Sequence, residues 1–226
     1  LDLICDEKIR SKRKNNSSIP IVFSSSCATY GIPKNNPISE ETPQTPISPY
    51  GRSKLMVEEI IKDLSKSANL KSVILRYFNA AGASEDALIG EKHIPETHLI
   101  PLVINTAIGL NKKLRIFGND FNTADGTCIR DYIHVVDLAN AHVLALDIFN
   151  ENSKIYNKLK GFANNENCNI YNLGNGKGVS VLEIIKKVEI ITNKKVNYNF
   201  SARREGDPPL LIASAEKFIR DFEWNP

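Results

Sequence analysis

A tyrosine and a lysine one helical turn apart are the residues of this chain whose types and spacing could do chemistry. Tyr50 and Lys54 stand at positions i and i+4, so their side chains share one face if this segment is helical. A phenol ionises only near pH ~10, and a neighbouring cation favours the ionised form. Lys54 could be that cation, and Ser26 could relay a proton between Tyr50 and a substrate hydroxyl. These groups suit the oxidation of an alcohol, in which hydride leaves the carbon, although such a pair also occurs on ordinary surface helices.

Two apolar strands and one helix are the elements that must position these groups. Residues 19–26 and 72–78 are each predicted to form a buried parallel strand, because their apolar runs are continuous. Residues 50–66 have the period of a helix, and the proline-rich stretch 31–49 before them is predicted to be a loop. The apolar face of this helix is predicted to consist of Leu55, Met56, Ile60, Ile61 and Leu64. Because ligands gather at the carboxyl ends of strands in open α/β sheets, Ser26 and Asn79 fall where a site is expected.

The rest of the chain alternates between strand and helix patterns. Residues 79–82 are predicted to turn, 99–110 to form a helix, and 114–117 and 130–135 to form strands separated by a loop. Asp137 is the predicted N-cap of a helix that runs to residue 149, and 150–169 is a predicted exposed loop before a strand at 170–173. Ser180 and Glu183 form a capping-box pattern that opens a helix over 181–191. The glycine-rich run 174–178 lacks the spacing of a dinucleotide fingerprint, so a structural turn is favoured over a phosphate cradle.

Composition excludes several classes of protein. The 226 residues suffice for one substantial core with a small second lobe, and 42% hydrophobic with 24% charged residues is ordinary for a globular protein. A net charge of +3 does not indicate a nucleic-acid partner, and the basic run at residues 8–14 is interpreted as a solvated helix end. Four widely separated cysteines indicate neither a zinc site nor a disulfide framework, and no metal is expected. No apolar stretch is long enough to span a membrane and no signal peptide is evident, which predicts a cytoplasmic protein.

Seven sequence blocks together resemble one enzyme family. They are SSSCATYG at 24–31, SPYGRSK at 48–54, RYFNAAG at 76–82, IFGND at 116–120, DGT at 125–127, RDYIHV at 130–135 and RREGD at 203–207. In this order they resemble the UDP-glucose 4-epimerases of the extended short-chain dehydrogenase/reductase family. The resemblance implies an α/β fold, with part of a Rossmann-like doubly wound parallel sheet and a smaller C-terminal α/β substrate-binding lobe. It assigns residues 1–82 to the NAD-binding domain and 83–226 mainly to the UDP-sugar lobe, with about 114–150 returning to the first domain.

The resemblance also implies a reaction and its residues. UDP-glucose and UDP-galactose would be interconverted with NAD as cofactor: C4 is oxidised to a 4-keto sugar, which rotates and is reduced on its opposite face. Tyr50 would take the proton of the 4′-hydroxyl, with Lys54 and Ser26 as the other catalytic residues. The same three residues and Phe78 would contact the cofactor. On the substrate side the resemblance implies roles for Asn79, His98, Leu99, Phe117, Arg130, Arg204, Asp207 and Leu211.

These substrate-side roles differ in kind. Arg130 and Arg204 align with arginines that bind the diphosphate, whose oxygens suit the guanidinium fork. Asp207 aligns with a carboxylate that accepts a hydrogen bond from the uridine ribose, and Phe117 with a residue that flanks uracil. Asn79 and the backbone at Leu99 align with phosphate contacts, and His98 stands beside them where many relatives carry asparagine. The bulk at Leu211 bears on whether N-acetylated sugars fit.

Other histidines and two departures complete the comparison with the family pattern. His134 is interpreted as a structural hydrogen-bonding residue rather than a general base, and His93 and His142 carry no signal. Cys27 and Ala28 replace the Ala-Thr of many relatives, and they supply neither the acid nor the base that a dehydratase needs after its serine strand.

The chain also lacks parts that the family has, and this leaves rival interpretations open. No glycine-rich NAD loop precedes the serine strand, and the family continues beyond residue 226. We therefore expect this polypeptide alone to be inactive, free of NAD and prone to aggregate. A homodimer is expected through the helix at 50–66 and a preceding helix that includes residues 1–10. The alternatives are another nucleotide-sugar epimerase or dehydratase of the same fold, and a truncated remnant without catalysis.

Overall fold

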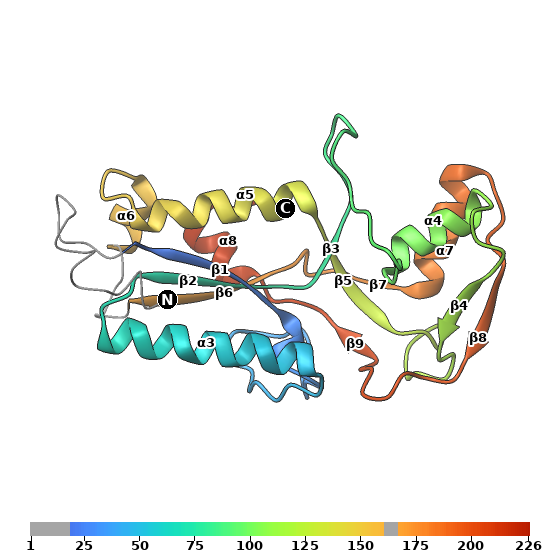
Figure 1. The fold of residues 1–226 in the computed structure, drawn as a ribbon, viewed down its shortest axis with the longest axis horizontal. Coiled ribbons are helices and arrows are strands. Elements are labelled where there is room, and N and C mark those ends of the chain that lie inside the picture. The colour runs from blue at the N-terminus through green and yellow to red at the C-terminus, as the bar shows by residue number, and fades with distance from the viewer. Residues whose placement is uncertain (1–18, 161–166) are drawn as a thin grey trace.

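The computed structural model describes residues 19–160 and 167–226, which form a larger and a smaller lobe joined by extended segments (Figure 1). The sheet of the larger lobe contains β1 (Ile21–Ser26), β2 (Ser72–Tyr77) and β6 (Cys168–Leu173) in the order β1-β2-β6. Both pairings are parallel, with Ser26 opposite Tyr77 and Tyr77 opposite Leu173. The carboxyl ends of the three strands therefore meet at one edge.

Helices cover both faces of this sheet. Helix α3 (Pro49–Ser67) lies on one face. Helices α5 (Val135–Leu146) and α8 (Glu216–Phe222) lie on the other, with α6 (Lys154–Leu159) packed beside α8 (Figure 1). Two short 3-10 turns, Cys27–Thr29 and Asp147–Phe149, follow β1 and α5. The buried core consists of Val73, Leu75, Ile133, Ala141, Ala145, Ile148, Tyr171, Leu173, Ala215, Phe218, Phe222 and Trp224. A parallel sheet between helices confirms the predicted α/β class.

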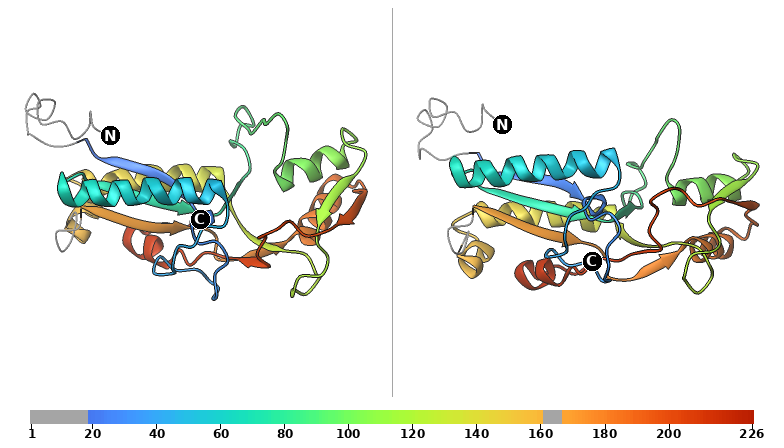
Figure 2. Two further views of the ribbon diagram at one scale, coloured as in Figure 1. Left: turned by 60° about the horizontal axis from the view of Figure 1, so that its bottom comes forward. Right: turned by 90° about the horizontal axis from the view of Figure 1, so that it is seen from below.

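The smaller lobe has a core of its own. Helices α4 (Leu99–Ala107) and α7 (Val181–Thr192) pack on the parallel pair β4 (Leu114–Phe117) and β8 (Tyr198–Ser201). Between the lobes, β5 (Ile129–His134) pairs with β3 (Asn79–Ala81), β7 (Gly178–Ser180) and β9 (Leu210–Leu211). Figure 2 shows from two further sides that these strands bridge the lobes.

The chain passes between the lobes several times. From the stretch 114–150, α5 packs on β1 and β2, whereas β4 belongs to the smaller lobe. β6 and α8 return to the larger lobe much later in the sequence. None of the described helices is long and apolar enough to cross a membrane. The expected helix at residues 1–10 lies outside the described residues.

Most predicted elements are present, and the capping box is confirmed because Ser180 and Glu183 make both reciprocal hydrogen bonds. Three local predictions were wrong. The loop expected over 150–169 contains α6, whose N-cap Ser153 accepts a hydrogen bond from the Tyr156 amide at 2.9 Å. Residues 79–81 form β3 instead of a turn, because β5 lies alongside them. The N-cap of α5 is His134 and not Asp137: His134 Nδ1 accepts from the Val136 amide at 3.2 Å.

The buried face of α3 also differs from the predicted apolar face. Its buried residues are Gly51, Glu58, Ile61 and Ser65. Met56 and Ile60, which belong to the predicted apolar side, are 61% and 48% exposed. Glu58 lies on the face that α3 turns towards the sheet, where it contacts buried Arg76 of β2.

Candidate active site

Two adjoining cavities lie at the carboxyl edge of the β1-β2-β6 sheet. The proximal cavity, of about 780 Å³, has Ser26, Tyr50, Tyr77 and Phe78 in its wall. The distal cavity, of about 770 Å³, extends into the smaller lobe. Its wall includes Leu99, Phe117, Arg130, Arg204 and Asp207. Asn79 and His98 line both cavities, so the predicted cofactor side and the predicted substrate side meet at one wall.

The start of α3 determines where Tyr50 lies. Ser48 caps the helix by accepting a hydrogen bond from the Gly51 amide at 3.0 Å, and Pro49 occupies the first turn, where it needs no hydrogen bond. A Cβ at Gly51 would lie 2.3 Å from the carbonyl oxygen of Ala28. Glycine therefore allows α3 to pack directly on the turn after β1, and this contact brings Tyr50 and Ser26 to the same cavity.

The tyrosine–lysine pair has the arrangement that its spacing predicts. Lys54 Nζ lies 5.7 Å from the centroid of the Tyr50 ring and donates a hydrogen bond to the carbonyl oxygen of Ser24 at 2.8 Å. This bond holds the ammonium beside the end of β1. Tyr50 is 52% exposed, so its phenol is open to the proximal cavity. Lys54 lines neither cavity. It lies beside the Tyr50 ring outside the cavity wall, and would act on the phenol through its charge.

A second tyrosine in the proximal cavity is unsuited to act as the base. Burial is the main cause that raises the pKa of the Tyr77 phenol, and the nearby Tyr50 raises it further. Tyr77 therefore stays protonated at neutral pH. Ser26 is nearly buried, and its Oγ accepts a hydrogen bond from the Ala28 amide at 3.2 Å. That bond uses an acceptor site of the hydroxyl and not its proton.

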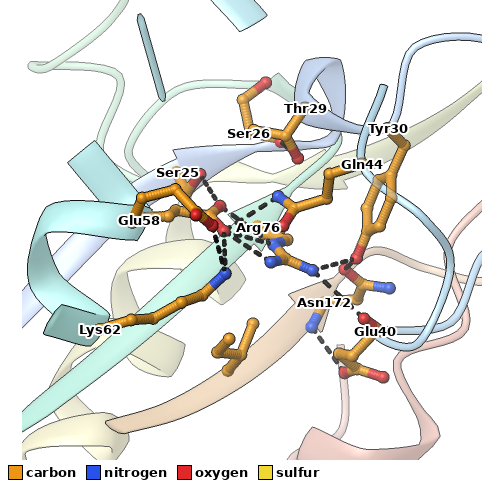
Figure 3. Close-up of polar contacts among 12 residues, drawn as sticks. Ser25, Ser26, Thr29, Tyr30, Glu40, Gln44, Glu58, Lys62, Arg76 and Asn172 are labelled. Carbon is orange, nitrogen blue, oxygen red and sulfur yellow. Dashed lines mark hydrogen bonds and ion pairs between the residues drawn. The ribbon is translucent and has the colours of Figure 1, made fainter. Parts of the chain in front are cut away.

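A buried ion pair that sequence reasoning missed holds α3 against the sheet (Figure 3). Arg76 of β2 is 2% exposed and Glu58 of α3 is 0% exposed. Arg76 Nη2 lies 2.5 Å and Nε 3.1 Å from Glu58 Oε2, and Ser25 donates to Glu58 Oε1 at 2.5 Å. Arg76 Nη1 donates to the Tyr30 hydroxyl at 2.9 Å. An arginine inside the apolar run of residues 72–77 was the sequence signal for this pair.

The distal cavity contains two arginines in different surroundings. Arg130 forms an ion pair with Asp207 through Nη2, and its Nη1 donates to the Ile129 carbonyl oxygen at 2.8 Å. Arg204 has its guanidinium carbon 4.0 Å from the centroid of the Phe117 ring. The structure thus joins in pairs four residues that the sequence suggested one by one. The pairing of Arg130 with Asp207 was not anticipated.

The remaining sequence-derived candidates fall in several places. Asn79 lies opposite Tyr132 in the β3–β5 pairing, and Leu99 is the first residue of α4, which His98 precedes. Leu211 lines neither cavity and packs instead beside Phe78 in a separate apolar cluster.

Two alternatives that the sequence raised are resolved by hydrogen bonds and burial. The glycine-rich run is a structural turn, since the amides of Asn175 and Gly176 donate to the Asp131 carboxylate at 2.8 and 3.0 Å. His134 has the structural role expected of it, as the cap of α5.

Burial raises the pKa of the Cys27 thiol to about 12, so this group is not a base at neutral pH.

Several known proteins and one family model are similar in sequence to this chain. A family model described as GDP-mannose 4,6 dehydratase matches residues 7–226. The chain is 47% identical over 206 residues to a UDP-glucose 4-epimerase of Streptococcus mutans, covering 91% of this chain and 58% of that protein. It is 45% identical over 205 residues to a UDP-glucose 4-epimerase of Rhizobium meliloti, again covering 91% and 58%. The chain therefore spans a little over half the length of these curated relatives.

Solved structures of UDP-glucose 4-epimerases are also similar to this chain. The UDP-glucose 4-epimerase of Brucella ovis in complex with NAD superposes with a TM-score of 0.82 at 42% identity, covering 96% of this chain and 63% of that one. The UDP-glucose 4-epimerase of Bifidobacterium longum in complex with NAD⁺ and UDP has a TM-score of 0.80 at 39% identity, covering 96% and 62%.

Proposed function

The chain belongs to the GDP-mannose 4,6 dehydratase family, and from this premise we propose that the whole protein interconverts UDP-glucose and UDP-galactose with NAD as its cofactor. One observation carries the proposal most directly. The exposed phenol of Tyr50 shares a cavity with Ser26 and Phe78, and this cavity adjoins one lined by Arg204 and Asp207. A base for an alcohol and cations for a diphosphate are therefore next to each other, as a nucleotide-sugar substrate requires.

The residues of the proximal cavity fit the nicotinamide end of NAD. Aromatic surface from Phe78 and Tyr77 stands beside the hydroxyls of Ser26 and Tyr50. We assign Ser26, Tyr50 and Phe78 of this wall to that end of the cofactor, together with Lys54, which lies next to Tyr50 outside the wall. When bound, NAD supplies a hydride acceptor and donor.

In this proposal Tyr50 transfers the proton, and its neighbours stabilise the phenolate and orient the substrate oxygen. The phenolate oxygen of Tyr50 takes the proton of the sugar 4′-hydroxyl and later returns it. The ammonium of Lys54 favours the phenolate by its charge, and the hydroxyl of Ser26 orients the sugar oxygen or relays the proton. The larger lobe thus carries the reacting groups, and the smaller lobe would hold the nucleotide.

The distal cavity supplies cations and backbone donors for the diphosphate. Arg204 and Arg130 are assigned to its oxygens, with Asn79 and the amide of Leu99. Leu99 is at the N-terminus of the nine-residue helix α4, whose N-cap makes no side-chain hydrogen bond, so free amides and the helix dipole favour an anion there. Phe117 is assigned to uracil and Asp207 to the ribose. Arg130 would then have to share Asp207 with the ligand.

Removal of either arginine is expected to weaken UDP binding. Arg204→Ala and Arg130→Ala should each cost about 1.5–3 kcal/mol of binding free energy, the range for a hydrogen bond to a charged group. Calorimetric titration with UDP measures this. Arg203→Ala is the matched control, because Arg203 is the adjacent residue and bonds to Asp120 at 2.6 Å outside both cavities. Unchanged UDP affinity in both test variants would remove these arginines from the site.

Two rival functions stay distinguishable. A dehydratase reaction is disfavoured because the protonated Cys27 thiol and Ala28 offer no acid–base pair after β1. Incubation of the whole protein with UDP-glucose should give UDP-galactose; a product that has lost water would favour the rival. The other rival is a remnant without catalysis, and the absence of turnover by the whole protein would favour it.

We also propose that the whole protein forms a homodimer through α3. Met56 and Ile60 expose apolar surface on this helix, and burial of such surface favours association. Light scattering at micromolar concentration should give twice the monomer mass, and Met56→Lys with Ile60→Lys should shift the protein towards monomer. A strict monomer before substitution would contradict the proposal.

The physiological setting is part of the same proposal. An enzyme that interconverts these sugars acts in galactose metabolism. We place it in the cytoplasm, since the three cysteines among the described residues are free thiols, as in a reducing compartment.

A further inference from the structure

We propose that Glu91, His93 and His98 form a binding site for a divalent transition-metal ion such as Zn²⁺. The three residues lie on the segment between β3 and α4 that projects from the molecule in Figure 1. Glu91 Oε1 lies 2.8 Å from His93 Nδ1 and 3.1 Å from His98 Nδ1. One oxygen and two imidazole nitrogens, all within 4.8 Å of one another, therefore face a common point.

The chemistry and dimensions of this group suit zinc. Imidazole nitrogen and carboxylate oxygen are both common zinc ligands. With bonds of ~2.0–2.1 Å, a tetrahedral ion holds its ligand atoms roughly 3.4 Å apart. The two contacts made by Glu91 are a few tenths of an ångström shorter than this, so small side-chain movements would admit the ion. Three protein ligands leave one position for water.

A fourth side chain, Glu96, contacts the same ring nitrogen of His98 that would bind the ion. Glu96 Oε1 accepts hydrogen bonds from the backbone amides of Thr97 and His98, each at 2.7 Å, and lies 3.0 Å from His98 Nδ1. The carboxylate is thus fixed to the backbone next to the imidazole, and His98 Nδ1 would exchange its contact with Glu96 for a bond to the ion. His98 also precedes α4, so its main chain is anchored to the smaller lobe.

The site adjoins the two cavities. Glu91 and His98 line both of them, on the wall where they meet. A bound ion would replace the negative charge of Glu91 on this wall by a net positive one, and it would tie Glu91 to His98 so that the intervening residues are ordered. The sequence-based expectation of no metal rested on cysteine spacing, and His93 had no assigned role.

Calorimetric titration of the metal-free protein, without a histidine tag, with ZnCl₂ tests the proposal. We expect one ion to bind with micromolar or tighter affinity, and His93→Gln and His98→Gln each to weaken binding at least ~10-fold. His134→Asn is the matched control: it removes an exposed histidine outside the cluster and keeps a good N-cap for α5, so zinc affinity should not change. The absence of zinc binding, or binding that both test variants leave unaltered, overturns the proposal.

Cobalt spectroscopy then identifies the ligands. Co²⁺ added to the same metal-free protein should give visible ligand-field bands without a thiolate charge-transfer band, and His93→Gln should abolish them. A thiolate band would overturn the proposal, because it would show that cysteine binds the ion.

Discussion

Replacement of Tyr50 by phenylalanine is expected to lower the rate of epimerisation by the whole protein by about 10²–10⁴-fold, the range for loss of a positioned general base. The ring of Tyr50 stays in the variant, so the packing of α3 on the turn after β1 is preserved. What is lost is the oxygen that takes the proton of the 4′-hydroxyl. The rate of conversion of UDP-galactose to UDP-glucose measures the effect.

The affinity for UDP provides the internal check on this experiment. It should stay within a few-fold of the original value, because the cations assigned to the diphosphate lie in the distal cavity. Tyr156→Phe is the matched control: Tyr156 is in α6, at the far end of the larger lobe from the two cavities (Figure 1). Near-normal turnover by Tyr50→Phe would sink the proposed role of this residue.

The second large effect is expected on stability. Arg76→Ala removes the closest cation from the buried carboxylate of Glu58 and leaves only Lys62 Nζ, 3.9 Å away. Breaking a buried ion pair by removing one partner destabilises proteins by about 3–5 kcal/mol. Arg76→Met combined with Glu58→Leu removes both charges together and should be less destabilising than Arg76→Ala alone. Urea unfolding followed by circular dichroism gives the free energies. Lys158→Ala, which breaks an ion pair with Glu223 in which both side chains are exposed, should change stability little.

The Glu58–Arg76 ion pair makes the free energy of unfolding depend on pH in the acidic range. Burial alone would raise the pKa of the Glu58 carboxyl, but the hydrogen bonds and charge of Arg76 outweigh burial and hold that pKa below its usual range. A carboxyl with a lowered pKa stabilises the fold above its unfolded pKa of ~4.3, and this stabilisation is lost as the pH falls further. The advantage of the natural pair over Arg76→Ala should therefore shrink below about pH 4. An unchanged difference down to pH 3 would contradict this account.

Features that depend on neighbours in the sequence were predictable. The strand and helix periods, the Ser180–Glu183 capping box and the shared face of Tyr50 and Lys54 all depend on residues at most four positions apart. The family resemblance rests on short blocks of the same kind. The local patterns predicted the strands and helices of an α/β fold, because backbone geometry relates such spacing directly to direction in space. The substrate-side candidate residues came from the family resemblance.

Tertiary structure decided which of these residues meet. Glu58 finds Arg76 in a neighbouring strand, and Arg130 finds Asp207 at a distance of 77 positions in the sequence. The side of α3 that stays exposed belongs to the same class. Each depends on how strands register and how helices rotate as they pack, and these quantities depend on contacts summed over the whole fold. Sequence spacing fixes direction within an element, whereas the contacts between elements determine its rotation and its partners.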